Sequence, residues 1–379
     1  ETVTITRGEM LKASIASSLG VGFEFYDFLI FGYAAPAISR LFFPVTNTLL
    51  SILYAFIVFA TGYLGRPLGA ILFGHMGDKI GRKYTLVFTI SLMGIASLGI
   101  AVLPTYYQIG IWAPILLTLL RILQGVSLGG EFGGGMTLTG EFAVGVIIAI
   151  IGVCIRLRVS ESPIFKFAKS RGNLSRLPLI DAFRAGYWRK IIHGLGFVIG
   201  GTTMTYATSV FALTYLTTIL HVPLLEVTIA QVIGFTVLII FSPIFGMLAD
   251  KYGRKPFMVA YAAGVLAFVY PYFLLISTKL LPLIILAQSL YNFMGSWMNG
   301  AYIATLLEMF PTKVRYTAIS FIYHVGVAAF GGTTPFIATY LIYITHYNLA
   351  PVYWGIAGMA VTLMAYLLTK ETKGTSLNY

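Results

Sequence analysis

The chain has 379 residues, of which 58% are hydrophobic and only 10% are charged, and its mean hydropathy is +0.86. About a quarter of the residues of a soluble domain are charged, so this composition excludes a soluble protein and predicts a membrane protein. The net charge of +12 could indicate nucleic acid binding or membrane topology. Its distribution along the chain decides between the two.

Apolar stretches suited to crossing a bilayer, about 20 residues each, recur along the chain. We expect spans near 13–36, 48–73, 86–105, 112–141, 144–158, 191–220, 227–249, 256–277, 280–308, 314–344 and 350–369. They are too long and continuous for barrel strands of alternating polarity, so the predicted fold class is an all-α polytopic membrane protein. The polar start and the absence of a small-residue cleavage pattern predict no cleavable signal peptide. The lone Cys154 excludes a disulfide framework.

The basic residues gather at alternate span boundaries. They lie near residues 7–12, 79–83, 156–190, 251–255, 313–315 and 370–373, whereas the opposite boundaries hold only Arg40 and Lys279. The positive-inside rule therefore predicts that both termini, both basic loops and the 159–190 stretch are cytoplasmic in a plasma-membrane protein. The charge sets the topology, and nucleic acid binding is rejected.

The number of expected spans conflicts with this topology. Two termini on one side require an even number of spans, yet an odd number is present in the whole chain and between the two basic loops. The conflict is localised to "GEFAVGVIIAIIGVCIRLR" at 140–158, where no turn separates Phe142 from Val144. We expect helix 5, part of helix 6 and a cytoplasmic loop to be absent near Ala143–Val144.

A small basic loop occurs twice, as "GHMGDKIGRK" at 74–83 and "GMLADKYGRK" at 246–255. Each copy follows the second span of its half, which predicts two parallel repeats of six helices. The chain resembles the major facilitator superfamily, whose signature loop this is. The resemblance implies an N-terminal half at 1–158, a cytoplasmic linker at 159–190 and a C-terminal half at 191–379.

Further stretches resemble the metabolite:proton symporter branch of that superfamily, whose members carry α-ketoglutarate, citrate, shikimate, proline and betaine. They are "GFEFYDFLIFG", "ATGYLGRPLGAILFGHMGDKIGRK", "RILQGVSLGGEFGG", "RLRVSESPIF" and "FGGTTPFIATYL". The C-terminal "KETKG" is similar to the tail of sugar and metabolite transporters. The resemblance implies a transporter rather than an enzyme, with no cofactor and no bound metal.

Ionisable residues within spans are costly and are functional candidates by default. They are Glu24, Asp27, Arg66, Arg121 and Glu131. Glu24 and Asp27 share a helix face and lie about 18 Å and 22 Å along the span from its basic start. Both therefore approach the midplane, where transporters bind substrate and coupling ion.

An exchange of partners would couple these groups. Arg121 can hold a carboxylate in a bidentate fork, and without substrate it would pair with Asp27. A substrate carboxylate that takes Arg121 would leave Asp27 unpaired in a low-dielectric site, and Asp27 would then take up a proton. Glu24 and Glu131 are alternative proton carriers, and a permanent ion pair between spans 1 and 4 is the structural alternative.

Polar and aromatic side chains are expected to complete the cavity. The candidate substrate residues are Arg121, Tyr26, Gln124, Tyr206, Tyr291, Asn292, Trp297, Asn299, Tyr323 and His324. Each could instead serve interhelical hydrogen bonding or the interfacial belt. The expected cytoplasmic gate comprises Arg66, Gly74, Asp78, Gly81, Arg82, Glu141, Asp250, Gly253, Arg254 and Arg315.

No nucleotide-binding loop, metal-spaced cluster or nucleophile elbow is present in the sequence. We therefore expect a monomeric proton symporter that imports a small carboxylate-bearing or zwitterionic metabolite by alternating access, with the lipid bilayer as its other partner. An uncoupled uniporter and a non-transporting sensor on a transporter fold are the alternatives.

Overall fold

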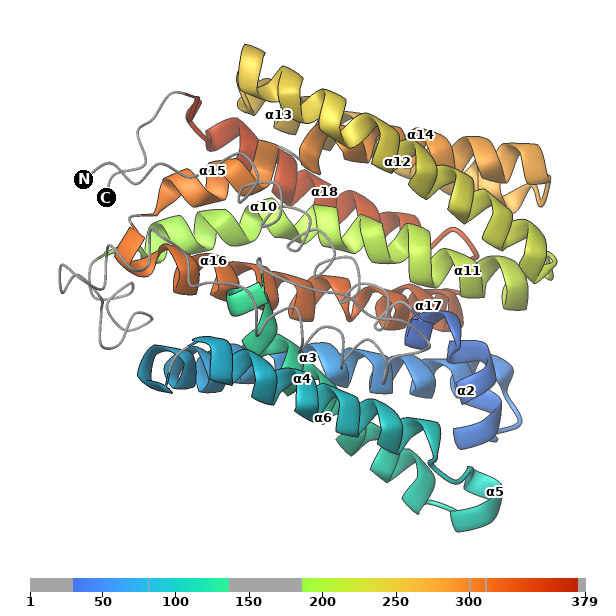
Figure 1. Cartoon of the computed structure of the whole chain (residues 1–379). Helices are drawn as coiled ribbons and strands as arrows, with labels where there is room; N and C mark the ends of the chain where they lie inside the picture. The colour runs from blue at the N-terminus through green and yellow to red at the C-terminus, as the bar shows by residue number, and fades with distance from the viewer. Residues whose placement is uncertain (1–29, 81, 136–185, 300, 311, 374–379) are drawn as a thin grey trace.

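The computed structural model describes residues 30–80, 82–135, 186–299, 301–310 and 312–373 (Figure 1). Within these ranges every regular element is a helix, and seven helices are long and apolar enough to cross a membrane. The predicted all-α membrane fold class is confirmed. Residues 1–29 and 136–185 lie outside the described ranges, and with them most of the expected spans 13–36 and 144–158.

The first group of helices comprises α2 (Ala35–Phe42), α3 (Thr48–Ile80), α4 (Arg82–Ala101), α5 (Tyr106–Ile109) and α6 (Trp112–Gly135). The helices α3 and α6 form its main contact, and α4 packs on α6. Glycines make the close approach possible: a Cβ on Gly65 would lie 2.8 Å from the carbonyl oxygen of Ile122, and one on Gly129 would lie 2.7 Å from the nitrogen of Ala70. Small residues at a helix interface are typical of membrane proteins.

The second group begins with a long span formed by α10 (Trp188–Tyr206), η1 (Ala207–Phe211), α11 (Ala212–Thr214) and η2 (Tyr215–Ile219). It continues with α12 (Leu224–Tyr252), α13 (Lys255–Ser277), α14 (Leu281–Asn299) and α15 (Ala301–Met309). The last elements are α16 (Thr312–Gly326), η3 (Val327–Gly331), α17 (Thr334–Thr345) and α18 (Pro351–Leu368). The elements η1, η2 and η3 are π-helical turns, which are rare and often occur at functional sites.

Proline and glycine residues explain these helix boundaries and the small differences from the expected ones. Helix α12 starts after Pro223 and stops at Gly253, whose φ of 108° suits glycine. The first span was expected to end at residue 36, but the chain turns at Ala34 and continues as α2, with Pro36 in the first turn, where a missing N–H costs little. Helix α4 stops at Ala101, a few residues before Pro104.

The two groups lie side by side, with α16 and α17 between α10 and α3 (Figure 1). Contacts between the groups run from α3 to α16, η3 and α17, and from α6 to α16. The interface therefore places the motif "ATGYLGRPLGA" of α3 against the motif "FGGTTPFIATYL" of η3 and α17. The half boundaries at 158 and 191 stay a prediction.

Candidate functional site

Arg121 lies in the interior of the first group, on α6, and is only 1% exposed. Its guanidinium carbon is 3.9 Å from the centroid of the Phe31 ring and 5.9 Å from that of Phe59. Its Nη1 donates a 2.9 Å hydrogen bond to Oε1 of Gln124, whose Nε2 donates to Oγ of Ser97 on α4. Cation–π contact and an amide acceptor thus orient a planar cation that has several donors.

Two tyrosines, one from each helix group, contact each other next to the Phe59 ring. The hydroxyls of Tyr63 on α3 and Tyr206 on α10 lie 2.7 Å apart in a hydrogen bond, and both side chains are buried. The Phe59 ring contacts Tyr63 at 5.0 Å and Tyr206 at 6.1 Å between centroids, and Phe31 stacks on Phe59 at 6.4 Å. A continuous row of aromatic rings therefore leads from Arg121 to the tyrosine pair.

Glycines of the "FGG" motif make room for the tyrosine pair. A Cβ on Gly331 would lie 2.9 Å from the Tyr206 ring, and one on Gly332 would lie 2.5 Å to 2.7 Å from Tyr63. The π-helical turns η1 and η3 flank this contact. Sequence reasoning named Tyr206 but missed Tyr63, Phe31 and Phe59, because aromatic residues in an apolar span carry no signal of their position.

Arg66 lies one turn after Tyr63, with its guanidinium carbon 4.4 Å from the centroid of that ring, and is 2% exposed. Its charge also acts on the fully buried His324 of α16, a helix that packs on α3. The His324 ring also contacts Tyr323 at 5.7 Å. The structure thus places Arg66, expected at the cytoplasmic gate, beside the tyrosine pair; a gate role stays a prediction.

The hydroxyl bond between Tyr63 and Tyr206 gives a direct prediction. Tyr63→Phe removes the hydroxyl hydrogen bond between these two rings, which is worth about 1 kcal/mol, so the transport rate should change about fivefold. Tyr215→Phe is the matched control, since the Tyr215 hydroxyl bonds to Ser277 within the second group at 3.0 Å. Uptake kinetics of both variants should differ only for Tyr63→Phe; equal effects would count against a role of the pair in movement between the halves.

Tyr291 belongs to a second polar cluster, between α10, η1, α13 and α14. Its hydroxyl lies 3.3 Å from Oγ1 of Thr205, the residue before Tyr206. Gln288 donates to the Tyr272 hydroxyl and to the carbonyl oxygen of Thr208 at 3.0 Å and 2.9 Å. Asn292 donates to the carbonyl oxygen of Gln288. Tyr291 is therefore linked to the tyrosine pair through Thr205, whereas the amide of Asn292 serves its own helix.

Trp297 and Asn299 are not brought to Arg121. The Trp297 ring packs on Phe293 and Phe245, with centroids 5.7 Å and 5.9 Å away. The exposed Asn299 donates to Oγ of Ser242 at 3.3 Å. These contacts join α12 to α14 inside the second group. The sequence could not separate them from cavity residues, since the polar stretch "YNFMGSWMNG" covers all sides of its helix.

For several candidates the structure does not describe the side chain. The three proton-coupling candidates are not described: Glu24 and Asp27 precede residue 30, and only the backbone of Glu131, in α6, is described. Tyr26, Gly81 and Glu141 also lie outside the described residues. For the gate residues Gly74, Asp78, Arg82 and Arg315 the helical backbone is described but the side chains are not.

A charged cluster surrounds the second basic loop. Arg254 forms ion pairs with Glu308 of α15 and, at 3.6 Å, with Asp250. The Glu371 carboxylate accepts bonds from the backbone nitrogens of Arg254 and Lys255, both at 3.0 Å. A Cβ on Gly253 would lie 2.7 Å from Glu371 Oε2, so glycine is required there by contact as well as by φ.

Sequence reasoning missed Glu308 and gave Glu371 no role. The signal for Glu308 was the repeat: an acidic residue ends the fourth span of each half, at Glu141 and at Glu308. Glu371 lies in the quoted "KETKG" tail. Its contacts show that this tail caps the start of α13, where free backbone N–H groups favour a carboxylate.

The pH dependence of stability tests this contact. Burial alone would raise the pKa of Glu371, but bonds from the backbone N–H groups of Arg254, Lys373, Lys255 and Thr372 outweigh it and lower the pKa below 4.5. Because the folded pKa is the lower one, the stabilisation is present above 4.5 and is lost as the pH falls through the folded pKa. Glu371→Gln should lower the melting temperature at pH 7 but not in strong acid. A difference that is independent of pH would contradict this assignment.

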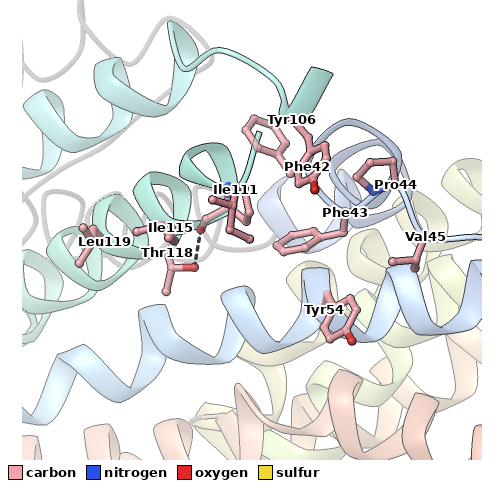
Figure 2. A pocket seen from close by; sticks show the side chains of 11 residues that line it. Phe42, Phe43, Pro44, Val45, Tyr54, Tyr106, Ile111, Ile115, Thr118 and Leu119 are labelled. Atoms are coloured by element: carbon pink, nitrogen blue, oxygen red, sulfur yellow. Dashed lines mark hydrogen bonds between the residues drawn. The ribbon is translucent and has the colours of Figure 1, made fainter. Parts of the chain in front are cut away.

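A pocket of about 530 Å³ lies at the ends of α3 and α6 that are remote from the basic loops (Figure 2). Tyr54 lines it from α3, where its ring contacts Phe43 at 5.8 Å. Ile115 and Leu119 line it from α6, and Ile111 lines it from the turn just before that helix. The lining contains no charged side chain and no predicted site residue, so it does not suit a carboxylate ligand.

The apolar helical spans define a polytopic membrane protein, and the comparisons with known proteins identify its class. The family model of the Major Facilitator Superfamily matches residues 194–378, and that of the Sugar (and other) transporter family matches residues 12–144. The inner membrane metabolite transport protein YhjE of Escherichia coli is 32% identical, over 97% of this chain and 95% of that protein. The chain belongs to the major facilitator superfamily. It is a multi-pass membrane transporter and not an enzyme.

Other similar proteins carry more specific names. The proline/betaine transporter of Salmonella typhimurium is 28% identical over all of this chain and 87% of its own length. A putative proline/betaine transporter of Staphylococcus aureus is 30% identical over 97% of this chain and 91% of its own length. The crystal structure of a D-xylose-proton symporter superposes with a TM-score of 0.66 at 18% identity, over 97% of this chain and all of that one.

Proposed function

We propose that this transporter is a proton symporter that imports a small carboxylate-bearing or zwitterionic metabolite. The observation that carries the proposal is the buried guanidinium of Arg121, oriented by Phe31 and Gln124 within the aromatic row that ends at the contact between the two groups. A guanidinium held in this way can form two parallel hydrogen bonds with a carboxylate.

The aromatic row suits the other end of a zwitterion. The Phe59 ring lies next to the Arg121 guanidinium, and Tyr63 and Tyr206 continue the row from it. Aromatic faces attract ammonium groups, quaternary ones included. The names of the proline/betaine relatives support this substrate class. We therefore place the substrate carboxylate at Arg121 and its cationic end along the rings.

The proposed proton carrier is Asp27, four residues before Phe31. In the helical span expected from the sequence, residues four apart share a face, and Phe31 contacts Arg121. Substrate that takes Arg121 would release Asp27 to bind a proton, so that each ligand improves the site for the other. Glu24 and Glu131 stay alternatives. Both termini are proposed to be cytoplasmic in the cell membrane.

Substrate-driven proton movement in proteoliposomes tests the proposal. Oxoacids, citrate, shikimate, proline and betaine are added separately while a pH dye reports the outside medium and a radiolabel reports uptake. One compound should be taken up with external alkalinisation. Asp27→Asn should abolish the alkalinisation, because the amide cannot carry a proton. Uptake with no pH signal in the unmodified protein would instead identify a uniporter.

A further inference from the structure

The buried pair of Arg121 and Gln124 continues into a third polar side chain on another helix. Arg121 and Gln124 are three residues apart on α6, where they share a face, and they are 1% and 3% exposed. Nη1 of Arg121 lies 2.9 Å from Oε1 of Gln124, and Nε2 of Gln124 lies 2.8 Å from Oγ of the half-buried Ser97 on α4. These three side chains form a relay that connects the buried cation to the neighbouring helix.

The donors and acceptors of these groups permit one direction along the relay. A guanidinium only donates hydrogen bonds, so the end of the Gln124 amide that faces Arg121 must be its oxygen. The NH2 end then faces α4, where the Ser97 hydroxyl accepts its hydrogen bond. Without that hydroxyl the amide could turn about its last side-chain bond, which has a broad preference, and present its NH2 group to the cation. Ser97 therefore selects the orientation in which the amide holds Arg121.

A neutral acceptor is the kind of neighbour that a binding site for carboxylates requires. A carboxylate at position 124 would form a charge-assisted pair with Arg121, roughly twice as strong as a bond between neutral groups, and would compete with a substrate carboxylate. The amide oxygen orients the guanidinium without neutralising its charge. The Phe31 ring, 3.9 Å from the guanidinium carbon, also attracts the cation without neutralising it. Both contacts therefore position the cation and leave its charge for another anion.

We propose that Gln124 and Ser97 are positioning residues for the Arg121 guanidinium, with the Ser97 hydroxyl fixing the amide and the amide fixing the cation. Gln124, which the sequence predicts as a substrate contact, then acts through Arg121 and not on the substrate itself. The role of the relay in uptake rests on the function proposed above, in which Arg121 receives a substrate carboxylate. The orientation of the guanidinium does not depend on that function.

A second hydrogen bond between α4 and α6 provides a matched control. Oγ of the fully buried Ser127 on α6 donates to the backbone carbonyl oxygen of Thr89 on α4. Ser127→Ala and Ser97→Ala each remove one hydroxyl that bonds between the same two helices, but only Ser97→Ala changes the relay. If Ser97 served only to join the helices, the two variants would behave alike.

Nitrogen-15 NMR of the full chain in lipid bilayers, with the arginine guanidinium groups labelled, tests the orientation in the absence of substrate. The Arg121 signals are assigned by their loss in Arg121→Lys. A guanidinium held at Nη1 gives two distinct Nη signals, whereas one that rotates gives an averaged signal. We expect distinct signals in the unmodified protein, in Ser127→Ala and in Ser97→Thr, which keeps the hydroxyl, and an averaged signal in Ser97→Ala. Distinct signals in Ser97→Ala, or averaged signals in both alanine variants, would overturn the proposal.

Uptake of radiolabelled proline and betaine into proteoliposomes tests the consequence for transport. Ser97→Ala should raise the KM about fivefold, the equivalent of one ordinary hydrogen bond, with little change in kcat, and Ser127→Ala should leave the KM unchanged. Gln124→Glu should raise the KM by up to about 100-fold, because the new carboxylate occupies Arg121. An unchanged KM in Gln124→Glu would overturn the positioning role. Absence of uptake of both compounds by the unmodified protein would instead contradict the zwitterionic substrate proposed above, and the NMR result would still decide the relay.

Discussion

Arg121→Ala is expected to lower the kcat/KM of substrate uptake about 100-fold. Hydrogen bonds to a charged group are worth up to about 3 kcal/mol, and each 1.4 kcal/mol corresponds to a factor of ten. The loss should be large because Arg121 is 1% exposed and lies 3.9 Å from the Phe31 ring, so that water cannot readily replace its contacts. Initial rates of radiolabelled uptake in proteoliposomes measure the effect.

Two further variants separate charge from geometry. Arg121→Lys keeps the cation but loses the planar fork, so an intermediate loss, on the order of tenfold, is expected. Arg40→Ala removes an exposed cation of the same half and should leave uptake unchanged. If Arg121→Ala transported at the normal rate with an unchanged KM, Arg121 would be a structural residue and the substrate site would lie elsewhere.

Gly125→Ala is expected to destabilise the protein by about 3 kcal/mol, the upper end of the usual cost of overpacking. A Cβ at this position would be forced against the backbone carbonyl of Gly62, and backbone atoms cannot move aside as a flexible side chain can. The helices α3 and α6 would have to separate along their whole contact. Arg121 on α6 and Tyr63 on α3 would then lose their relative positions, so transport should fall together with stability.

Thermal unfolding in detergent measures this effect, and the chain offers a matched control. Gly94 on α4 has no atom within 4 Å of an added Cβ, so Gly94→Ala should be neutral or slightly stabilising through its better helix propensity. If both variants melted at the same temperature, the close packing of α3 on α6 would not limit stability.

Several features of this protein followed from local sequence. The apolar stretch 48–73 matches the apolar part of α3, and the stretch 256–277 matches α13 within one residue. Such boundaries are predictable because each span must satisfy its own backbone hydrogen bonds in lipid. Arg121 and Arg66 were also identifiable from the sequence, because charged side chains are costly and therefore rare inside membrane spans. Repetition of the basic loop was sufficient to indicate the superfamily.

The contacts between spans could not be predicted in this way. Tyr63, Phe31 and Phe59 are ordinary residues of apolar helices. Packing within the first group brings Phe31 and Phe59 to Arg121, and the contact between the groups brings Tyr63 and Phe59 to Tyr206. Trp297 and Asn299 have the composition of cavity residues, yet the pairing of α12 with α14 directs their contacts elsewhere. In a bilayer many apolar faces are equally acceptable to lipid, so hydropathy cannot specify which faces meet.

The sequence alone determined that this is a membrane protein of two helical repeats, which helices span, and which charges lie inside. Each of these properties depends on the transfer of single segments into lipid, which is local and additive along the chain. The tertiary structure alone decided that Tyr63 meets Tyr206 and that the Phe59 ring contacts both of them. These properties depend on close packing of surfaces far apart in the sequence, where a single glycine decides how near two helices can come.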